Sequence, residues 1–228
     1  RADLPDEAKS RLDKLFALNP PPGQFRSAAA VLLGDVLAKL GKADAAVKQY
    51  RKAAAEAEDS DVIYLAYTHL IESLLKKKND PEAVVVADEF AGRLPEGRTF
   101  LFLAEFLSGA KRPQEVLKYA DQAARLLVTD ETGQAKAVYY GMAANYETKQ
   151  YAAAADSLKR LTRYIRNRDP KDPMVEEAVF WDCRINQSEK DAAGARKAYQ
   201  SYLERYPAGK YAPDARFNLG LLAFDAGE

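Results

Sequence analysis

The chain has 228 residues, which suffices for one large domain or two small ones with a well-buried core. Lysine plus arginine and aspartate plus glutamate both total 34, so the zero net charge supplies no global field for nucleic acid or anionic membranes. Cys183 is the only cysteine, which excludes an intrachain disulfide and a thiolate metal cluster. No apolar run approaches the roughly 18 residues of a membrane span, and we expect no direct membrane insertion.

Apolar residues recur at helical spacing along almost the whole chain, and no segment shows convincing strand alternation. Ala, Leu, Lys, Glu and Arg dominate, and these are strong helix formers. The pattern predicts helices at 27–40 and 43–57, 62–77 and 81–94, 99–108 and 113–127, 134–148 and 151–167, 175–187 and 192–206, and 212–226. We expect a loop at 129–133 and a stiff, proline-containing break at 169–173.

Turn residues separate the predicted helices. Gly41 permits the tight turn between the first pair. Asn79-Asp80 is expected to cap a helix that Pro81 opens, and Pro113 is expected to open the second helix of the third pair.

A repeated pattern runs through these helix pairs. Its cleanest copy is Leu33-Gly34 followed by Gly41, Ala46, Tyr50 and Ala53. The small residue of each first helix is Gly34, Ala104, Ala143, Cys183 or Gly220, with the bulkier Ile71 as the exception, and the anchor of each second helix is Ala46, Ala83, Val116, Ala154 or Ala195. The pattern resembles the tetratricopeptide repeat (TPR) family, although its anchors are 37, 33, 38 and 41 residues apart and the family unit has about 34.

The resemblance implies an all-α, right-handed superhelical solenoid of antiparallel helix pairs. We expect a single solenoid over 1–228, with about five full repeats and a half repeat at each end. The predicted half repeats are 6–19 and 212–228, and the full repeats are 27–60, 62–97, 98–131, 134–170 and 173–209. The unfinished ends indicate part of a longer array; alternatively, the terminal helices are caps.

One phrase near the C-terminus narrows the resemblance. Tyr206-Pro207 ends one repeat, and Tyr211-Ala-Pro-Asp-Ala215 begins the next. This phrase is similar to repeats of bacterial envelope proteins, such as the periplasmic Tol–Pal partner and the lipoprotein of the outer-membrane β-barrel assembly machinery. It implies a location in the bacterial periplasm or cell envelope, with the cytoplasm as the alternative.

In the TPR family, the first helix of each pair lines the concave face, so its unpacked positions are candidate ligand contacts. Aromatic residues recur at these positions in the last four repeats. Large rings supply contact area at low entropic cost, and polar neighbours orient a bound peptide. The predicted peptide groove consists of Phe102, Glu105, Tyr140, Glu147, Phe180, Trp181, Arg184, Phe217 and Asn218. The alternative is that the rings pack between helices.

A second candidate surface is a basic strip on the second helix of the fourth pair, at 151–167. Arg160, Arg163 and Asn167 share one side of that helix, with Lys159 and Arg166 beside them, and Arg168 and Lys171 continue the strip into the following loop. Such a strip could bind an acidic protein segment, a phosphorylated peptide or nucleic-acid phosphates. The alternative is a solvated convex face.

Catalytic chemistry has little support. His69 and Cys183 fall in different repeats, and His69 has only Glu72 as a nearby carboxylate along its helix. One histidine cannot define a metal site, and no glycine-rich phosphate loop is present. We therefore expect no enzymatic activity, no cofactor and no metal.

These observations predict a non-enzymatic scaffold that binds a peptide or protein segment in an aromatic-lined concave groove, within a bacterial cell-envelope complex. A self-assembling scaffold, or homo-oligomer, is the first alternative. Binding of nucleic acid or an acidic partner through the basic strip at 159–171 is the second.

Overall fold

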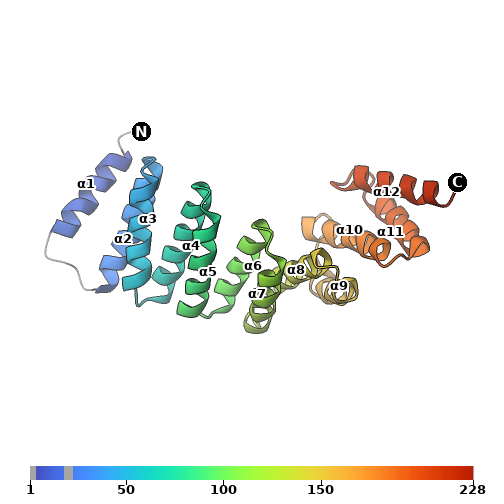
Figure 1. The fold of residues 1–228 in the computed structure, drawn as a ribbon, viewed down its shortest axis with the longest axis horizontal. Helices are drawn as coiled ribbons and strands as arrows, with labels where there is room; N and C mark the ends of the chain where they lie inside the picture. Colours follow the sequence, from blue (N-terminus) through green and yellow to red (C-terminus); the bar gives the residue numbers. More distant parts are fainter. Residues whose placement is uncertain (1–3, 18–22, 228) are drawn as a thin grey trace. The chain divides into compact units, whose positions relative to one another are not determined.

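The computed structural model describes residues 4–17 and 23–227. These residues form twelve α-helices and no strand, which confirms the all-α prediction (Figure 1). The helices are α1 (Leu4–Ala17), α2 (Gly23–Lys39), α3 (Ala43–Glu56), α4 (Ser60–Lys76), α5 (Asp80–Arg93), α6 (Gly97–Gly109), α7 (Pro113–Leu126), α8 (Glu131–Glu147), α9 (Tyr151–Ile165), α10 (Pro173–Ser188), α11 (Ala192–Arg205) and α12 (Ala212–Asp225).

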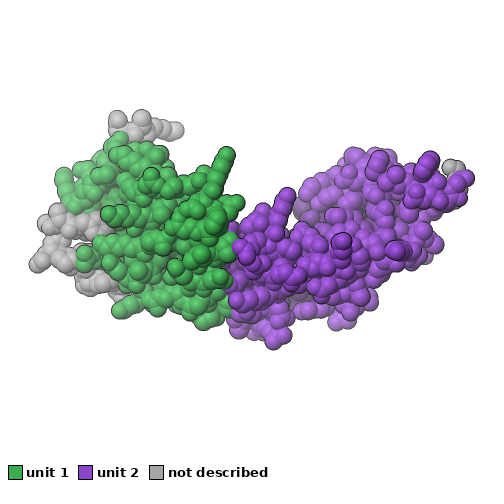
Figure 2. Space-filling model, viewed as in Figure 1, with its two compact units in different colours: residues 1–102 green, residues 103–228 purple. Residues whose placement is uncertain are grey.

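The chain divides into two compact units, residues 1–102 and residues 103–228, and the boundary falls within α6 (Figure 2). In unit 1, helices α1 to α5 pack in sequence, α1 on α2, α2 on α3, α3 on α4 and α4 on α5, and α2 also contacts α4. In unit 2, each helix from α7 to α12 packs against its successor. Packing between successive helices is the arrangement expected of a helical repeat.

The predicted helices agree with the observed ones to within a few residues, with two local exceptions. The prediction of a loop at 129–133 is wrong in part, because α8 begins at Glu131. Asp130 is its N-cap, and the carboxylate accepts a hydrogen bond from the Gly133 amide at 2.9 Å. Asn79 is the N-cap of α5 but makes no side-chain cap bond, and that helix begins at Asp80, one residue before Pro81.

Each turn within a full helix pair contains one residue in the left-handed backbone region. These residues are Gly41, Lys78, Lys111, Lys149 and Lys190, with φ values of 72°, 57°, 56°, 61° and 63°. Each lies five residues before an alanine or valine anchor of the following helix. The next amide closes the turn on the preceding helix, as where Asn79 N donates to Leu74 O at 2.9 Å. The uneven repeat lengths therefore arise outside this turn.

The anchors form the centre of each packed pair. Ala46, Ala83, Ala154 and Ala195 are completely buried, and Val116 is nearly so. The residue twelve positions before each anchor, the slot residue, is also buried; in α8 this residue is Met142 and not the predicted Ala143. The assignment of Ala143 to this position was therefore off by one, because we expected a small side chain there. Gly220 in α12 is exposed and has no neighbour within 4 Å of a built β-carbon.

Within the described residues, every helix is too short or too polar to span a lipid bilayer.

Candidate binding surface

The predicted groove ring Phe180 lies in the core, which corrects its assignment. Its ring stacks on Tyr211 with a centroid separation of 4.5 Å and an interplanar angle of 7°, and it also meets Tyr199 and Tyr202 edge to face. Only 7% of Phe180 is exposed. Phe180 therefore fastens α10 to α11 and to the start of α12, and offers almost no surface to a ligand.

Trp181 is also buried, in the cluster formed by α8, α9 and α10. Its ring meets Tyr146 of α8 at 5.1 Å in an edge-to-face contact. The Arg184 guanidinium covers both rings, at 4.6 Å from the Tyr146 centroid and 4.7 Å from the Trp181 centroid. Trp181 is thus a support for Arg184, and the guanidinium is the part nearer to solvent.

Arg184 has no carboxylate partner among the residues that the structure describes. The side chain is partly buried, and contacts with two ring faces restrict its rotation. A positive charge held in this way is prepared to accept an external carboxylate with a small loss of side-chain entropy.

Tyrosine and glutamate side chains continue this surface along α8 and α10. Tyr139 donates to Glu177 Oε1 at 2.6 Å, which joins the two helices. Burial and the adjacent Glu105 carboxylate raise the pKa of Tyr140 to about 12. Burial and the Glu177 carboxylate also raise the pKa of Tyr139, so the phenols of Tyr139 and Tyr140 stay protonated at neutral pH. Glu105 and Glu147 are exposed, as a ligand contact requires.

Helix α12 has two apolar sides. Ala212, Ala215, Leu219 and Leu222 pack on the α10–α11 core. Phe217, Leu221 and Phe224 are 67%, 41% and 80% exposed, and their spacing places them on another side of the helix. Asn218 lies beside α10, where its Oδ1 accepts from Gln187 Nε2 at 3.3 Å. The groove prediction included Phe217 but missed Leu221 and Phe224, although their i, i+4, i+7 spacing was visible in the sequence.

Phe102 belongs to unit 1 and is described there alone. Its ring meets Phe90 of α5 at 6.2 Å and Tyr64 of α4 at 6.3 Å, both edge to face. Part of the Phe102 ring therefore packs between helices. Packing between helices was the alternative to a groove position for the predicted aromatic residues.

The basic strip is divided among three hollows. Lys159 and Arg166 line a groove between α9 and α10. Arg160 lines a small hollow with residues of α7 and α8, and Arg163 lines a third hollow beside Glu131. Arg166 also lines the third hollow, together with Arg163, so the strip is shared among three hollows, and only Arg160 lines one that none of the other three cations lines.

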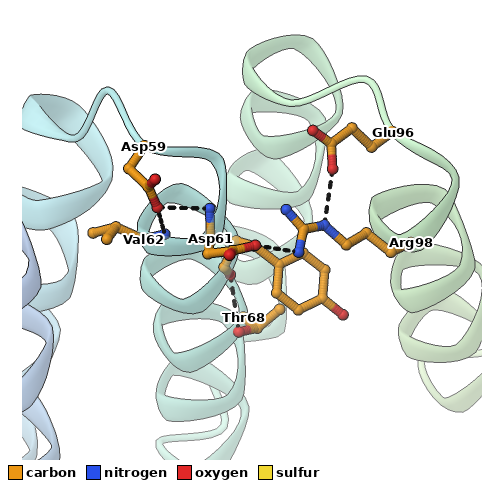
Figure 3. A network of polar contacts seen from close by, with 7 residues as sticks. Asp59, Asp61, Val62, Thr68, Glu96 and Arg98 are labelled. Carbon is orange, nitrogen blue, oxygen red and sulfur yellow. Dashed lines mark hydrogen bonds and ion pairs between the residues drawn. The ribbon is translucent and has the colours of Figure 1, made fainter.

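Unit 1 contains a polar network that we did not predict (Figure 3). Arg98 bridges Asp61 on α4, at 2.5 Å, and Glu96, at 2.8 Å, and its guanidinium lies 4.9 Å from the Tyr64 ring centroid. Asp59 caps α4 by accepting from the amides of Asp61 and Val62. The network connects successive repeats, so a sequence reading within one helix could not find it.

His69 also has a partner in the neighbouring repeat. Its Nδ1 lies 2.8 Å from Asp35 Oδ1, and the same oxygen accepts from the Tyr50 hydroxyl at 2.8 Å. From the sequence, Glu72 was the carboxylate considered as a partner for His69; the structure pairs His69 with Asp35 instead. These three side chains join α2, α3 and α4.

Cys183 lies in the core of unit 2, and burial raises the pKa of its thiol to about 12. Its Sγ donates to Val179 O at 3.4 Å. A thiol in this environment remains protonated and is a poor nucleophile at neutral pH. Among the described residues, no group of three or more His, Cys, Asp or Glu side chains has the arrangement of a metal site.

Solved structures similar to this chain share its helix arrangement. YrrB, a TPR protein with an unusual peptide-binding site, is 16% identical, with a TM-score of 0.62 over 83% of this chain and 91% of YrrB. The fold is that of tetratricopeptide repeat proteins. PilW, a type IV pilus biogenesis factor, is 16% identical, with a TM-score of 0.56 over 87% of this chain and 89% of PilW.

A signal-transduction ATPase from Pyrococcus horikoshii with a tetratricopeptide repeat sensor is 15% identical, with a TM-score of 0.67 over 99% of this chain and 37% of the ATPase chain. No protein-family profile and no curated protein matches the sequence. The likeness therefore concerns the fold alone.

Proposed function

We propose that this TPR-type chain is a non-enzymatic scaffold, and that unit 2 binds a protein segment across the first helices α8, α10 and α12. The observation that carries the proposal is the Arg184 guanidinium, held over Tyr146 and Trp181 without a carboxylate partner in the described residues. The bound segment supplies that carboxylate, from an acidic side chain or a chain terminus.

The exposed side of α12 supplies the apolar part of this surface. A helix that is apolar on two sides is normally covered on both. Phe217, Leu221 and Phe224 expose rings and an aliphatic chain, and the Gln187–Asn218 hydrogen bond links this helix to α10 near Arg184. The segment therefore combines an acidic group with apolar side chains one or two helical turns away.

A peptide library displayed on phage tests this function. We expect selection on the intact chain to enrich peptides that combine Asp, Glu or a free C-terminus with Leu, Phe or Trp. Arg184→Ala and Phe217→Ser should each weaken a selected peptide by about tenfold or more, which is the effect of losing a central contact. Arg125→Ala and Val128→Ser are matched controls, since Arg125 is an exposed α7 cation and Val128 is 70% exposed in the loop after α7.

Equal weakening by the controls, or enrichment of peptides without any acidic group, would contradict the proposal. The YrrB structure supports it only as a precedent for a peptide-binding site on this fold.

We also propose that the partner belongs to a bacterial cell-envelope complex, with the periplasm as the compartment. Support comes from the Tyr206-Pro207 and Tyr211–Ala215 phrase and from the likeness to the pilus biogenesis factor PilW. Fractionation of the native source organism with an antibody against the chain tests the location. Recovery with the cytoplasmic fraction would overturn it.

A further inference from the structure

A long groove lies between α9 and α10 in unit 2, on a side of α10 different from the one that carries Arg184. Its volume is about 700 Å³. The α9 wall includes Ala152, Ala155, Lys159, Thr162 and Arg166, and the α10 wall includes Val175, Ala178, Asp182, Ile185 and Glu189. Each set recurs every three or four residues, so the groove follows both helices along most of their length, about 20 Å.

The groove has a cause in the sequence. In α2, α4 and α6, the buried residue twelve positions before the anchor is Gly34, Ile71 and Ala104. The positions one before and three after this residue are both leucine, namely Leu33 and Leu37, Leu70 and Leu74, and Leu103 and Leu107, and all six are buried. In α10, the same positions relative to Cys183 are Asp182 and Asn186, and both line the groove. Two polar side chains thus replace two core leucines.

The neighbouring repeat supports this explanation. In α8, the corresponding positions are Gly141 and Asn145, and a hollow of about 110 Å³ lies there against α7. Space between repeats therefore appears where the leucine pair is lost. The larger loss in α10 goes with the larger space.

The groove has an apolar floor and two rims of opposite charge. Leu158, Ile165, Val175 and Ile185 are largely buried and supply the floor. The α9 rim carries Lys159, Arg166 and Asp156, and the α10 rim carries Asp182 and Glu189. Arg168 and Arg205 also line the groove, and Arg168 is paired with Asp172. Lys159 pairs with Asp156 at 3.1 Å, but both side chains are more than 70% exposed, so the pair is weak.

The pKa of the Asp182 carboxyl indicates that the groove is a poorly solvated environment. Its pKa is raised by desolvation, although the residue is open to the groove. A cationic group from a ligand would remove that unfavourable effect.

We propose that the α9–α10 groove is a docking site for an amphipathic helix of a partner protein, with acidic residues along the flank next to α9 and basic residues along the flank next to α10. The length matches a helix of four turns, and α9 itself has 15 residues. Ala152, Ala155 and Ala178 allow close approach of its aliphatic stripe. The opposed rims select its direction, because reversing the helix would exchange its flanks.

Three stapled helical peptides with the same leucine stripe test the proposal by fluorescence polarisation with the intact chain. One has Glu on one flank and Lys on the other, one has Glu on both flanks, and one has Lys on both. We expect the mixed peptide to bind about tenfold or more tightly than either of the others, since each of them places like charges together at one rim.

Charge reversal on α9 provides the decisive variant. Lys159→Glu with Arg166→Glu makes both rims acidic, so the preference should move to the all-Lys peptide. Arg160→Glu with Arg163→Glu is the matched control: it changes the net charge equally on the same helix, at two positions that do not line the α9–α10 groove. The control should bind the mixed peptide as the unmodified chain does.

A second variant fills the groove and does not depend on the charges. Asp182→Leu with Asn186→Leu restores the leucine pair of α2, α4 and α6, and should abolish binding of the mixed peptide while the chain remains folded by circular dichroism. Unchanged binding in this variant would overturn the proposal. So would a preference of the unmodified chain for the all-Glu peptide, an equal effect of the Arg160 and Arg163 control, or no binding of any peptide.

Two further results would assign the groove to another occupant and overturn the proposal. One is tighter binding of a single-stranded oligonucleotide, which would identify the α9 rim as a phosphate site. The other is a dimer in light scattering that the leucine-filled variant abolishes, which would assign the groove to a second copy.

Discussion

The ring of Tyr50 occupies the space that a side chain on Gly34 would need. A β-carbon built on Gly34 lies 2.5 Å from Tyr50 Cε1 and 2.7 Å from Cδ1. The clearest copy of the repeat pattern therefore has a glycine for a steric reason. The ring is also fixed in place, because its hydroxyl donates to Asp35 at 2.8 Å.

Gly34→Ala should lower the free energy of unfolding by about 1–3 kcal/mol, since the added methyl group overpacks the α2–α3 contact. Urea denaturation followed by circular dichroism measures this change. Gly220→Ala is the control: this glycine lies within α12 with nothing near its β-carbon, so alanine should stabilise by about 0.5–1 kcal/mol. A neutral Gly34→Ala would show that the ring moves aside at no cost.

Lys149→Gly should stabilise the chain by about 1 kcal/mol, because its φ of 61° is costly for a residue with a β-carbon. Lys136→Gly, at an exposed position inside α8, should destabilise by a similar amount, since glycine there increases the entropy lost on folding. Thermal and urea unfolding of the two variants should therefore shift in opposite directions. Shifts of the same sign would disprove a backbone origin.

Trp181→Ala should destabilise the chain by about 3–5 kcal/mol, because it removes a buried ring from the α8–α10 cluster. Arg184→Ala should cost about 1–2 kcal/mol or less, the value of a partly exposed cation over aromatic rings. Loss of peptide binding in a Trp181 variant is thus ambiguous, whereas loss in an Arg184 variant is not. Comparable destabilisation by both substitutions would refute this division of roles.

Alkaline pH should destabilise the protein. Burial raises the pKa of the Cys183 thiol to about 12, and burial with a glutamate partner raises the pKa values of Tyr139 and Tyr202. The unfolded groups release protons at about pH 8.5 for cysteine and about 10 for tyrosine, so the unfolded state binds fewer protons above those values. Stability is therefore fully present at neutral pH and decreases as pH rises through this range.

Urea unfolding at a series of pH values from neutral to strongly alkaline measures this decrease. Each group contributes about 1.4 kcal/mol per pH unit to the slope while the pH lies above its pKa in the unfolded state and below its pKa in the folded state. Tyr139→Phe should lower the neutral-pH stability, through loss of the Glu177 hydrogen bond, and should also make the alkaline decrease less steep. An unchanged slope in this variant would exclude Tyr139 as one of the titrating groups.

The local features of the chain were predictable because they depend on short-range chemistry. Helical periodicity and the prolines located the helices, and Gly41 located a left-handed turn. The four lysines with positive φ were not predicted, since lysine carries no left-handed signal of its own. Asp130 was a recognisable N-cap, but the surrounding polar residues suggested a loop.

The predicted binding surface depended on helix register, where one residue rotates a side chain by about 100°. Phe180 and Trp181 were assigned to the same surface, yet one packs on α11 and α12 and the other on α8. Both sides of a first helix can carry apolar residues in a repeat protein, because neighbours cover it on more than one side. The sequence pattern therefore could not distinguish the rings that pack between helices from those that face a ligand.

The sequence by itself determined an all-helical repeat with its turns and anchors, because those features are set by periodicity and by a few backbone-restricted residues. The tertiary structure alone decided that Arg184 lies over two rings and that Lys159 and Arg166 face a groove. It also decided that Asp182 and Asn186 line this groove, at the positions where α2, α4 and α6 bury leucine. The physical reason is that such contacts join residues from different helices. Which side chains stay exposed to a ligand therefore depends on how the neighbouring helices pack.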